Sequence, residues 1–166
     1  MSKFIFLFIF LFSINVFAVS ETQIKAVFLE KFTHLIEWPK DNNEDFLVCI
    51  LQDGEFSKAL KDIYASKTFK NKKVSILDIK DKNKIPNCQL LFIGKETEEI
   101  DKVISRIQDR AILTVSDDNT KTTHLVMINM FLQKNRFKYV INNKAAQKSK
   151  IKISHLLLRS AQEVIK

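Results

Sequence analysis

Hydrophobic and polar residues follow one another along this chain in two rhythms, one typical of helices and one typical of strands. The first helical rhythm begins after the capping-box pattern Ser20-x-x-Gln23. A proline disfavours the helical conformation of the residue before it, so we expect this helix to end at Trp38-Pro39. Its predicted inner stripe, at steps of three and four residues, consists of Ile24, Phe28, Phe32, Leu35 and Ile36.

Short apolar runs then alternate with amphipathic stretches as far as Ser116-Asp117. The runs predict strands over 46–51, 73–79, 88–94 and 111–115. The amphipathic stretches predict helices over 55–66 and 96–108. Their inward residues are expected to be Phe56, Leu60 and Ile63 in the first and Ile100, Val103, Ile104 and Ile107 in the second. This alternation indicates a parallel sheet with helices packed on it.

The pattern changes in the last third of the chain. Residues 125–132 and 136–142 are strand-like and are separated only by Gln133-Lys134-Asn135, which predicts an antiparallel hairpin. A short helical piece follows at 144–148, and a last helix is expected from Ser154 onward. Its predicted buried stripe is Leu157, Leu158, Ala161, Val164 and Ile165. The whole predicts a single-domain α/β sandwich: a mixed, mostly parallel sheet of about six strands, helices packed on it, and a C-terminal antiparallel hairpin plus helix.

The first 18 residues have a different composition from the rest. Lys3 is followed by an apolar run from Phe4 to Phe12, and the segment closes on Val16-Phe17-Ala18. This is the pattern of a secretory signal peptide cleaved after Ala18, which leaves residues 19–166 as the mature domain. The alternative is a membrane anchor, but a spanning helix needs about 20 apolar residues. Ser13 and Asn15 interrupt this run well before that length.

Charge and cysteine content change the picture only slightly. The net charge of +8 comes from lysines scattered among acidic residues, without the aromatic interleaving of a nucleic-acid surface. Nucleic acid is therefore not expected as a partner. Export would place Cys49 and Cys88 in an oxidising compartment, where the two can form one intramolecular bridge. Neither cysteine belongs to a CxxC motif, and no histidine stands at metal-ligand spacing from them, so neither a metal nor a cofactor is expected.

Motifs of catalysis are absent from the sequence. It contains no GxGxxG, GxxxxGK[ST], HExxH or GxSxG, and Gly54 and Gly94 are its only glycines. The best candidate ligand site is Ser116-Asp117-Asp118, at the carboxyl end of a predicted parallel strand, with Asn129 nearby. The competing interpretation is an Asx-rich turn that simply leaves the strand. His34, His124 and His155 have no candidate nucleophile beside them in sequence, so we expect no enzyme.

Four segments together resemble the YfiR-like family of exported bacterial proteins. They are KAVFLEKFTHLIEWP at 25–39, FLVCILQDGEF at 46–56 with NCQLLFIG at 87–94, LTVSD at 113–117 with MIN at 127–129, and RFKYVINNKAAQKSKIKISHLLLRSA at 136–161. Two positions depart from the family's pattern. Leu125-Val126 stands where a glycine pair is common, and Lys150 stands where a glycine suited to a left-handed helix cap is common.

The resemblance implies regulation rather than catalysis. It implies a soluble periplasmic brake that binds the periplasmic part of an inner-membrane diguanylate cyclase or sensor kinase, holds down cyclic-di-GMP synthesis and so affects biofilm formation. An outer-membrane lipoprotein would release the brake, and homodimerisation is left open. The candidate contact residues are Trp38, Pro39 and Arg159, with the outer face of the first helix. The alternative hypothesis is a periplasmic small-ligand binder that uses the strand ends near Ser116, Asp117 and Asn129.

The Trp38-Pro39 pair itself allows two interpretations. Pro39 ends the helix, but that does not explain why the only tryptophan of the chain precedes it. A tryptophan buries a large area and needs a partner for its ring N–H, so its default role is to fix the end of the helix to the sheet. Contact with a partner protein is the alternative.

Overall fold

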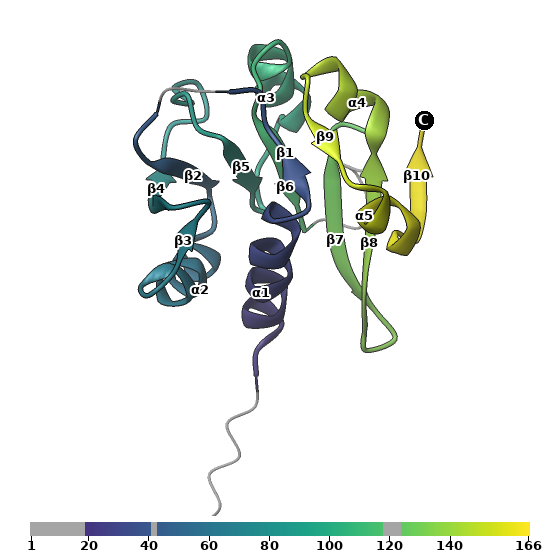
Figure 1. Ribbon diagram of the computed structural model, residues 1–166, viewed down its shortest axis with the longest axis horizontal. Helices are drawn as coiled ribbons and strands as arrows, with labels where there is room; N and C mark the ends of the chain where they lie inside the picture. Colours follow the sequence, from purple (N-terminus) through teal and green to yellow (C-terminus); the bar gives the residue numbers. More distant parts are fainter. Residues whose placement is uncertain (1–18, 41–42, 118–123) are drawn as a thin grey trace, which may run out of the picture.

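The computed structural model of the protein describes residues 19–40, 43–117 and 124–166 (Figure 1). The segment interpreted as a signal peptide and Asp118 of the candidate ligand site lie outside these ranges. The described helices are α1 (Glu21–Thr33), α2 (Gly54–Tyr64), α3 (Ile100–Ile107), α4 (Asn143–Lys148) and α5 (His155–Ser160). The described strands are β1 (Ile36–Glu37), β2 (Phe46–Leu51), β3 (Thr68–Phe69), β4 (Lys72–Ile79), β5 (Leu90–Ile93), β6 (Leu113–Ser116), β7 (Ile128–Gln133), β8 (Arg136–Asn142), β9 (Lys152–Ile153) and β10 (Glu163–Ile165).

Eight of these strands form one curved sheet in the order β10-β8-β7-β6-β5-β2-β4-β3. The five central strands, β4, β2, β5, β6 and β7, are mutually parallel, as the alternating pattern predicts. Numbered among themselves along the chain they run 2-1-3-4-5, so the order reverses between β2 and β5. In open α/β sheets, the carboxyl ends of the strands at such a reversal are where ligands commonly bind.

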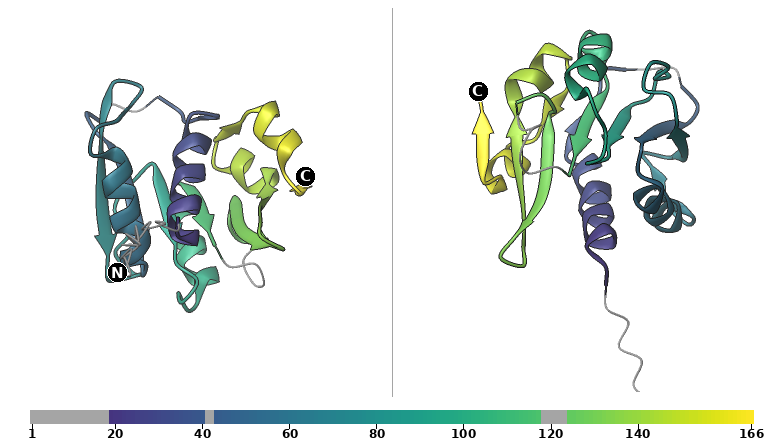
Figure 2. Two further views of the ribbon diagram at one scale, coloured as in Figure 1. Left: turned by 90° about the horizontal axis from the view of Figure 1, so that it is seen from below. Right: turned by 180° about the vertical axis from the view of Figure 1, so that it is seen from behind.

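The sheet separates two hydrophobic cores because successive side chains of a strand point to opposite faces. Val48 and Ile50 of β2 join the first core, whereas Cys49 and Leu51 join the second. Helices α1 and α2 cover the first face, and α3 covers the second, as the two views of Figure 2 show. The second face has the lighter cover, because the connection 80–89 between β4 and β5 contains no helix.

Several sharp turns use left-handed backbone at residues other than glycine. Lys134 and Asn135 have φ of 50° and 58° and form the two-residue turn of the β7–β8 hairpin, which confirms the predicted hairpin. Lys70 and Asn71 make the corresponding turn between β3 and β4. Lys150, at the position where the resemblance implies a glycine, has φ of 59°. The position therefore keeps the left-handed conformation although its residue is not suited to it.

The sheet is larger than the roughly six strands expected. One added strand is the very short β3, a partner of β4. The other is β10, which the apolar pattern had assigned to the last helix. That helix ends at Ser160, Ala161 is extended with φ −66° and ψ 147°, and Glu163–Ile165 pair in parallel with β8. β-Branched Val164 and Ile165 fit a strand well, and an open sheet edge supplies their backbone partners.

The first helix differs from its prediction at both its end and its buried face. It is capped by the Ser20–Gln23 box as expected, but it stops at Thr33 rather than at Trp38. Ile36-Glu37 instead form β1, paired with β9, so tertiary pairing overrides the local helical pattern. The buried residues of α1 are Lys25, Ala26, Leu29, Glu30, Phe32 and Thr33, whereas Ile24 and Phe28 of the predicted stripe are half-exposed.

The helix α3 is shorter than predicted. Glu99 precedes it with a left-handed φ of 56° and without a side-chain cap, so the helix begins at Ile100 rather than at Glu96. Its buried residues Ile100, Val103 and Ile107 are those expected. Across the described ranges, none of the helices has the length and apolar character needed to cross a membrane.

Candidate functional site

A group of polar side chains lies around the carboxyl ends of β2 and β6, and we call it the carboxyl-edge cluster. It consists of Asp53 after β2, Ser116 and Asp117 at the end of β6, Asn129 at the start of β7 and Lys25 of α1. Ser116 ends β6 and lies opposite Asn129 of β7. Both side chains are buried, and the Ser116 hydroxyl donates to Asn129 Oδ1 at 3.0 Å. The structure thus brings together the residues of the candidate ligand site that it describes.

Lys25 joins this cluster from α1 although it occupies the buried side of the helix. Its Nζ lies 3.1 Å from Asp117 Oδ2 and 2.6 Å from Glu21 Oε1. Burial lowers the pKa of Lys25, but the hydrogen bonds that its ammonium donates to Glu21 and Asp117, together with their negative charges, outweigh this effect and raise the pKa. The ion pair with Asp117 therefore fixes α1 to the edge of the sheet.

Asp53, two residues after the end of β2, completes the cluster, and the chain at Gly94 passes close to it. Asp53 caps α2 by accepting from the Phe56 N–H at 2.9 Å. Burial raises the pKa of Asp53, and the charge of Asp117 adds to the effect. A Cβ at Gly94 would lie 2.6 Å from the carbonyl oxygen of Gln52, so only glycine fits where β5 leaves the sheet.

Most polar groups of the carboxyl-edge cluster bond to one another. Asp117 Oδ1 is the exception: it is buried and has no hydrogen-bond partner among the described residues. Within the described ranges, no group of three or more histidine, cysteine, aspartate or glutamate side chains is arranged to hold a metal ion. The chemistry visible here is mainly that of a structural clamp.

A second candidate site lies on the outer side of α1. Phe28 of α1 stacks on Phe137 of β8, with ring centroids 3.8 Å apart and ring planes within 5° of parallel. Both rings are half-exposed and rest on the buried rings of Phe32 and Tyr139. Val27 on the same helix is 40% exposed, and Leu156 on α5 is 64% exposed. We call Val27, Phe28, Phe137 and Leu156 the aromatic patch.

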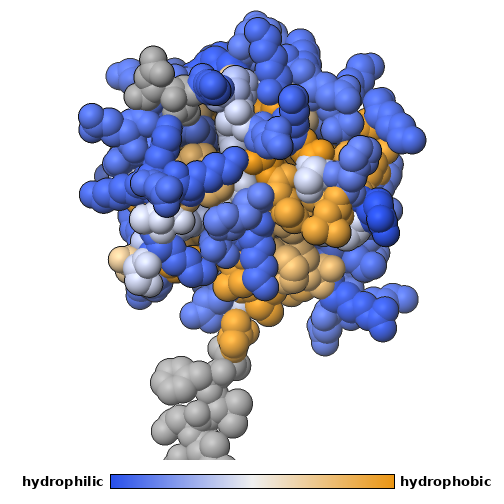
Figure 3. All heavy atoms as spheres, in the orientation of Figure 1, coloured by the Kyte–Doolittle hydropathy of each residue, from blue (hydrophilic) through white to orange (hydrophobic). Residues whose placement is uncertain are grey.

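The aromatic patch belongs to a wider apolar area of the surface. Figure 3 shows hydrophobic side chains gathered over α1, α5 and the β7–β8 hairpin, surrounded by hydrophilic ones. Ile153 and Leu158 are partly buried and pack against the same core as Phe28 and Phe137. Isolated apolar side chains on a surface are ordinary, but a contiguous patch with a polar rim marks an interaction site.

Trp38 is held on the sheet and stays partly exposed. Its ring N–H donates to the Gln89 carbonyl at 2.8 Å, and its indole meets the rings of Phe46 and Phe69 edge-on. These contacts are the expected ones for an anchor that fixes the segment after α1. Pro39 is exposed beside it and lines two small surface hollows of about 190 and 180 Å³.

The two cysteines lie side by side in the second core. Both are buried free thiols in the structure, so the predicted Cys49–Cys88 bridge is not present in it. The pKa of Cys49 is raised far above its usual range. The main cause is the hydrogen bond with the Cys88 thiol, and burial is the second cause. Such a thiol is unreactive toward solvent reagents in the folded protein. Their adjacency is what a bridge requires, and the bridge stays a prediction that thiol labelling of the unfolded, exported protein tests.

The remaining sequence candidates are spread over the surface. His34, His124 and His155 are exposed and come from different elements. Arg159 is exposed on α5, three residues after Leu156, so the two lie on the same side of that helix. Leu156 itself was not predicted as a site residue. Its signal was the run Leu156-Leu157-Leu158, since one helix face cannot bury three consecutive residues.

A small α/β domain whose polar cluster is largely bonded to itself and which exposes an apolar patch has the features of a protein-binding domain. The chain belongs to the YfiR/HmsC-like family, whose sequence model matches residues 22–162. Members of this family are periplasmic regulators of diguanylate cyclases, so the general class of the protein is a regulator.

A comparison with solved structures finds a similar fold in a protein of low sequence identity. The structure titled "The Crystal Structure of the ABC domain in complex with L-Trp from Streptococcus pneumonia" aligns with a TM-score of 0.58 and 12% sequence identity. The alignment covers 87% of this chain and 60% of that one, so this chain spans less than two thirds of its length. At this identity the likeness concerns the fold alone. No curated protein matches the chain.

Proposed function

We propose that this protein is an exported regulator that binds the periplasmic sensor region of an inner-membrane signalling protein, a diguanylate cyclase in the first instance, and represses its activity. Membership of the YfiR/HmsC-like family supports the class of partner. The observation that carries the proposal on this chain is the aromatic patch, because it is a preformed apolar surface that no described residue covers.

The geometry of the patch suits protein binding. The Phe28 and Phe137 rings are already stacked and supported by buried rings beneath them, so binding would cost little side-chain entropy. Large aromatic side chains in such positions commonly supply most of the free energy of an interface. Leu156 on α5 is 64% exposed and would lose most of its exposed area on contact with a partner.

The rim of the aromatic patch is polar and carries positive charge. Lys31 lies four residues after Val27 on α1, and Arg159 lies three residues after Leu156 on α5, both exposed. Charges around an apolar centre speed the encounter with an acidic partner and fix its orientation more than they add affinity. Arg159 keeps the role of candidate contact proposed from the sequence, as a residue of the rim.

A pair of matched substitutions tests the assignment of the surface. Leu156 and Leu77 are both exposed leucines, but Leu77 lies on β4, outside the patch. The periplasmic segment of a membrane diguanylate cyclase encoded beside this protein serves as the partner in a binding titration. We expect Leu156→Gln to weaken binding about tenfold, which corresponds to about 1.4 kcal/mol, and Leu77→Gln to leave it unchanged.

Two results would contradict the proposal in different ways. Absence of binding to every adjacent cyclase or sensor kinase would remove the regulatory function. Equal effects of Leu156→Gln and Leu77→Gln would keep the function and move the interface away from the aromatic patch. A screen of outer-membrane lipoproteins by the same titration would identify the partner expected to release the regulator.

A second candidate function is small-ligand binding at the carboxyl-edge cluster. The unpartnered, buried Asp117 Oδ1 beside Lys25 and Asp53 favours it, since a ligand donor would satisfy that oxygen. A thermal-shift screen tests this function: a ligand at 100 times its dissociation constant stabilises by about 2.7 kcal/mol. A shift that persists in Asp117→Asn would place the ligand elsewhere.

A further inference from the structure

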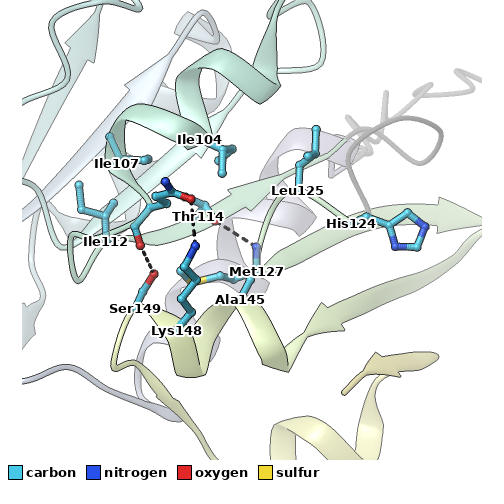
Figure 4. A pocket seen from close by; sticks show the side chains of 11 residues that line it. Ile104, Ile107, Ile112, Thr114, His124, Leu125, Met127, Ala145, Lys148 and Ser149 are labelled. Carbon is cyan, nitrogen blue, oxygen red and sulfur yellow. Dashed lines mark hydrogen bonds between the residues drawn. The ribbon is translucent and has the colours of Figure 1, made fainter.

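A cavity of about 190 Å³ opens between α3 and α4 and is lined by residues of both hydrophobic cores. Ile104 and Ile107 of α3 form one wall, and Leu125, Met127 and Ala145 form the other (Figure 4). Met127 and Ala145 belong to the first core, whereas Ile104, Ile107 and Leu125 belong to the second. The cavity therefore lies in the seam between the cores and is separate from both the carboxyl-edge cluster and the aromatic patch.

The walls of this cavity are apolar, but one end is polar and positively charged. Lys148, the last residue of α4, donates from Nζ to Gln108 Oε1 at 3.0 Å, and the Ser149 hydroxyl donates to the Gln108 carbonyl at 3.1 Å. Lys148 is exposed, and Gln108 is its only partner within the described ranges. His124 also borders the cavity, but its ring points away from the other lining residues (Figure 4).

We propose that this cavity binds a small organic carboxylate with an aromatic or short branched apolar body. A cavity of about 150 Å³ lined by leucine, isoleucine and phenylalanine holds a benzene ring, so the observed volume accommodates one ring with a substituent. The body would lie between Ile104 and Leu125. The Lys148 ammonium would release the neutral amide oxygen of Gln108. It would instead donate a charge-assisted hydrogen bond to the carboxylate of the ligand.

The surroundings explain why this place admits a ligand while the rest of the second core does not. Cys49, Leu91 and Val103 are fully buried under α3 and the adjoining chain. Ile104 and Leu125 pack on that core but remain half-exposed. The inference is independent of the regulatory function proposed above.

Benzoate and its neutral analogue benzamide are the probes that test the cavity. In methyl-labelled protein, benzoate is expected to shift the Ile104 and Leu125 methyl resonances saturably, with a dissociation constant on the order of 1 mM. Ala145→Leu adds volume at the cavity wall and should abolish the saturable shifts for both probes. Unshifted lining methyls in the wild type, or unchanged binding in Ala145→Leu, would overturn the proposal.

Two lysines of α4 provide a charge test that does not depend on filling the cavity. Lys148→Gln should weaken benzoate about two- to fivefold and leave benzamide unchanged. Lys144→Gln removes the same charge from an exposed residue of the same helix that does not line the cavity, so both probes should bind as in the wild type. If the two variants weakened benzoate equally, or if Lys148→Gln weakened benzamide as much as benzoate, the assigned carboxylate contact would be wrong. If Ala145→Leu does not fold, the comparison of Lys148→Gln with Lys144→Gln still tests whether benzoate binds in the cavity.

Discussion

The helix α1 has two sides that meet the rest of the molecule in opposite ways. On the inner side, Lys25 is buried and paired with Asp117, at the edge where α/β folds commonly bind ligands. On the outer side, Val27 and Phe28 are exposed or half-exposed, with Phe28 stacked on Phe137. The polar groups of the carboxyl-edge cluster, where general rules place a ligand, thus mostly bond to one another. The apolar side chains of the aromatic patch, on the other side of the helix, are exposed or half-exposed.

The difference shows how a site should be judged in a fold of this class. Position at the carboxyl ends of parallel strands is only a prior expectation. The state of the groups decides: Lys25, Ser116 and Asn129 have partners within the protein, and only Asp117 Oδ1 lacks one. Apolar side chains of the aromatic patch, in contrast, gain free energy only when a partner covers them.

The largest expected effect comes from breaking the inner side. Lys25→Met leaves Asp117 buried without its cation and should destabilise the protein by about 3 kcal/mol in urea unfolding. The double variant Lys25→Met/Asp117→Leu removes both charges and should recover most of that loss. If Lys25→Met cost less than about 0.5 kcal/mol, or the double variant were worse than the single one, the cluster would not be a clamp.

The same ion pair predicts a dependence of stability on pH. The pKa of Lys25 is raised above 10.5 in the folded protein, so its contribution is fully present below the unfolded value. It is lost as the pH rises through the raised folded value. The difference in unfolding free energy between wild type and Lys25→Met should therefore shrink between about pH 10 and pH 12. A constant difference over that range would contradict the assigned pairing.

Trp38 offers a sharper case, because it was a candidate for both roles. Its hydrogen bond to Gln89 and its contacts with Phe46 and Phe69 predict that Trp38→Ala costs about 2 kcal/mol of stability, less than a fully buried tryptophan. Pro39→Ala, at the exposed neighbour, serves as control and should change stability by less than about 0.5 kcal/mol. Normal stability of Trp38→Ala together with lost partner binding would reverse the assignment.

The smallest expected effect concerns the backbone between α4 and β9. Lys150 has φ of 59°, so Lys150→Gly should stabilise the protein by up to about 1 kcal/mol. Lys144→Gly, inside the regular helix α4, should instead destabilise it by about that amount. Thermal unfolding of the two variants measures the contrast, and a loss of stability in both would show that the turn does not demand a left-handed residue.

The sequence predicted the parallel part of the sheet because buried strands and amphipathic helices alternate clearly along it. It also predicted the β7–β8 hairpin, since Lys134-Asn135 leave room only for a tight turn. It failed where local patterns are ambiguous. Val164 and Ile165 fit either a helix stripe or a strand, and only the open edge of β8 decides between them.

The candidate sites divide in the same way. Ser116 and Asp117 could be placed at the carboxyl end of a parallel strand from the sequence alone. Asn129 lies at the start of β7, and only the register of β7 against β6 brings it opposite Ser116. The burial of Lys25 and the stacking of Phe28 on Phe137 could not be predicted, because both depend on which side of α1 faces the sheet. The periodicity indicated one stripe, centred on Ile24 and Phe28, and the structure turns the helix toward Lys25 and Leu29 instead.

The most direct test of the central claim is the activity of the partner rather than its binding alone. A membrane diguanylate cyclase from the same organism, reconstituted with its periplasmic region, would be assayed for cyclic-di-GMP synthesis with increasing amounts of this protein. We expect the wild-type protein and Leu77→Gln to repress synthesis at the same concentration, and Leu156→Gln to require about ten times more. Synthesis that is unaffected by a bound wild-type protein would contradict the account of a repressor acting through the aromatic patch.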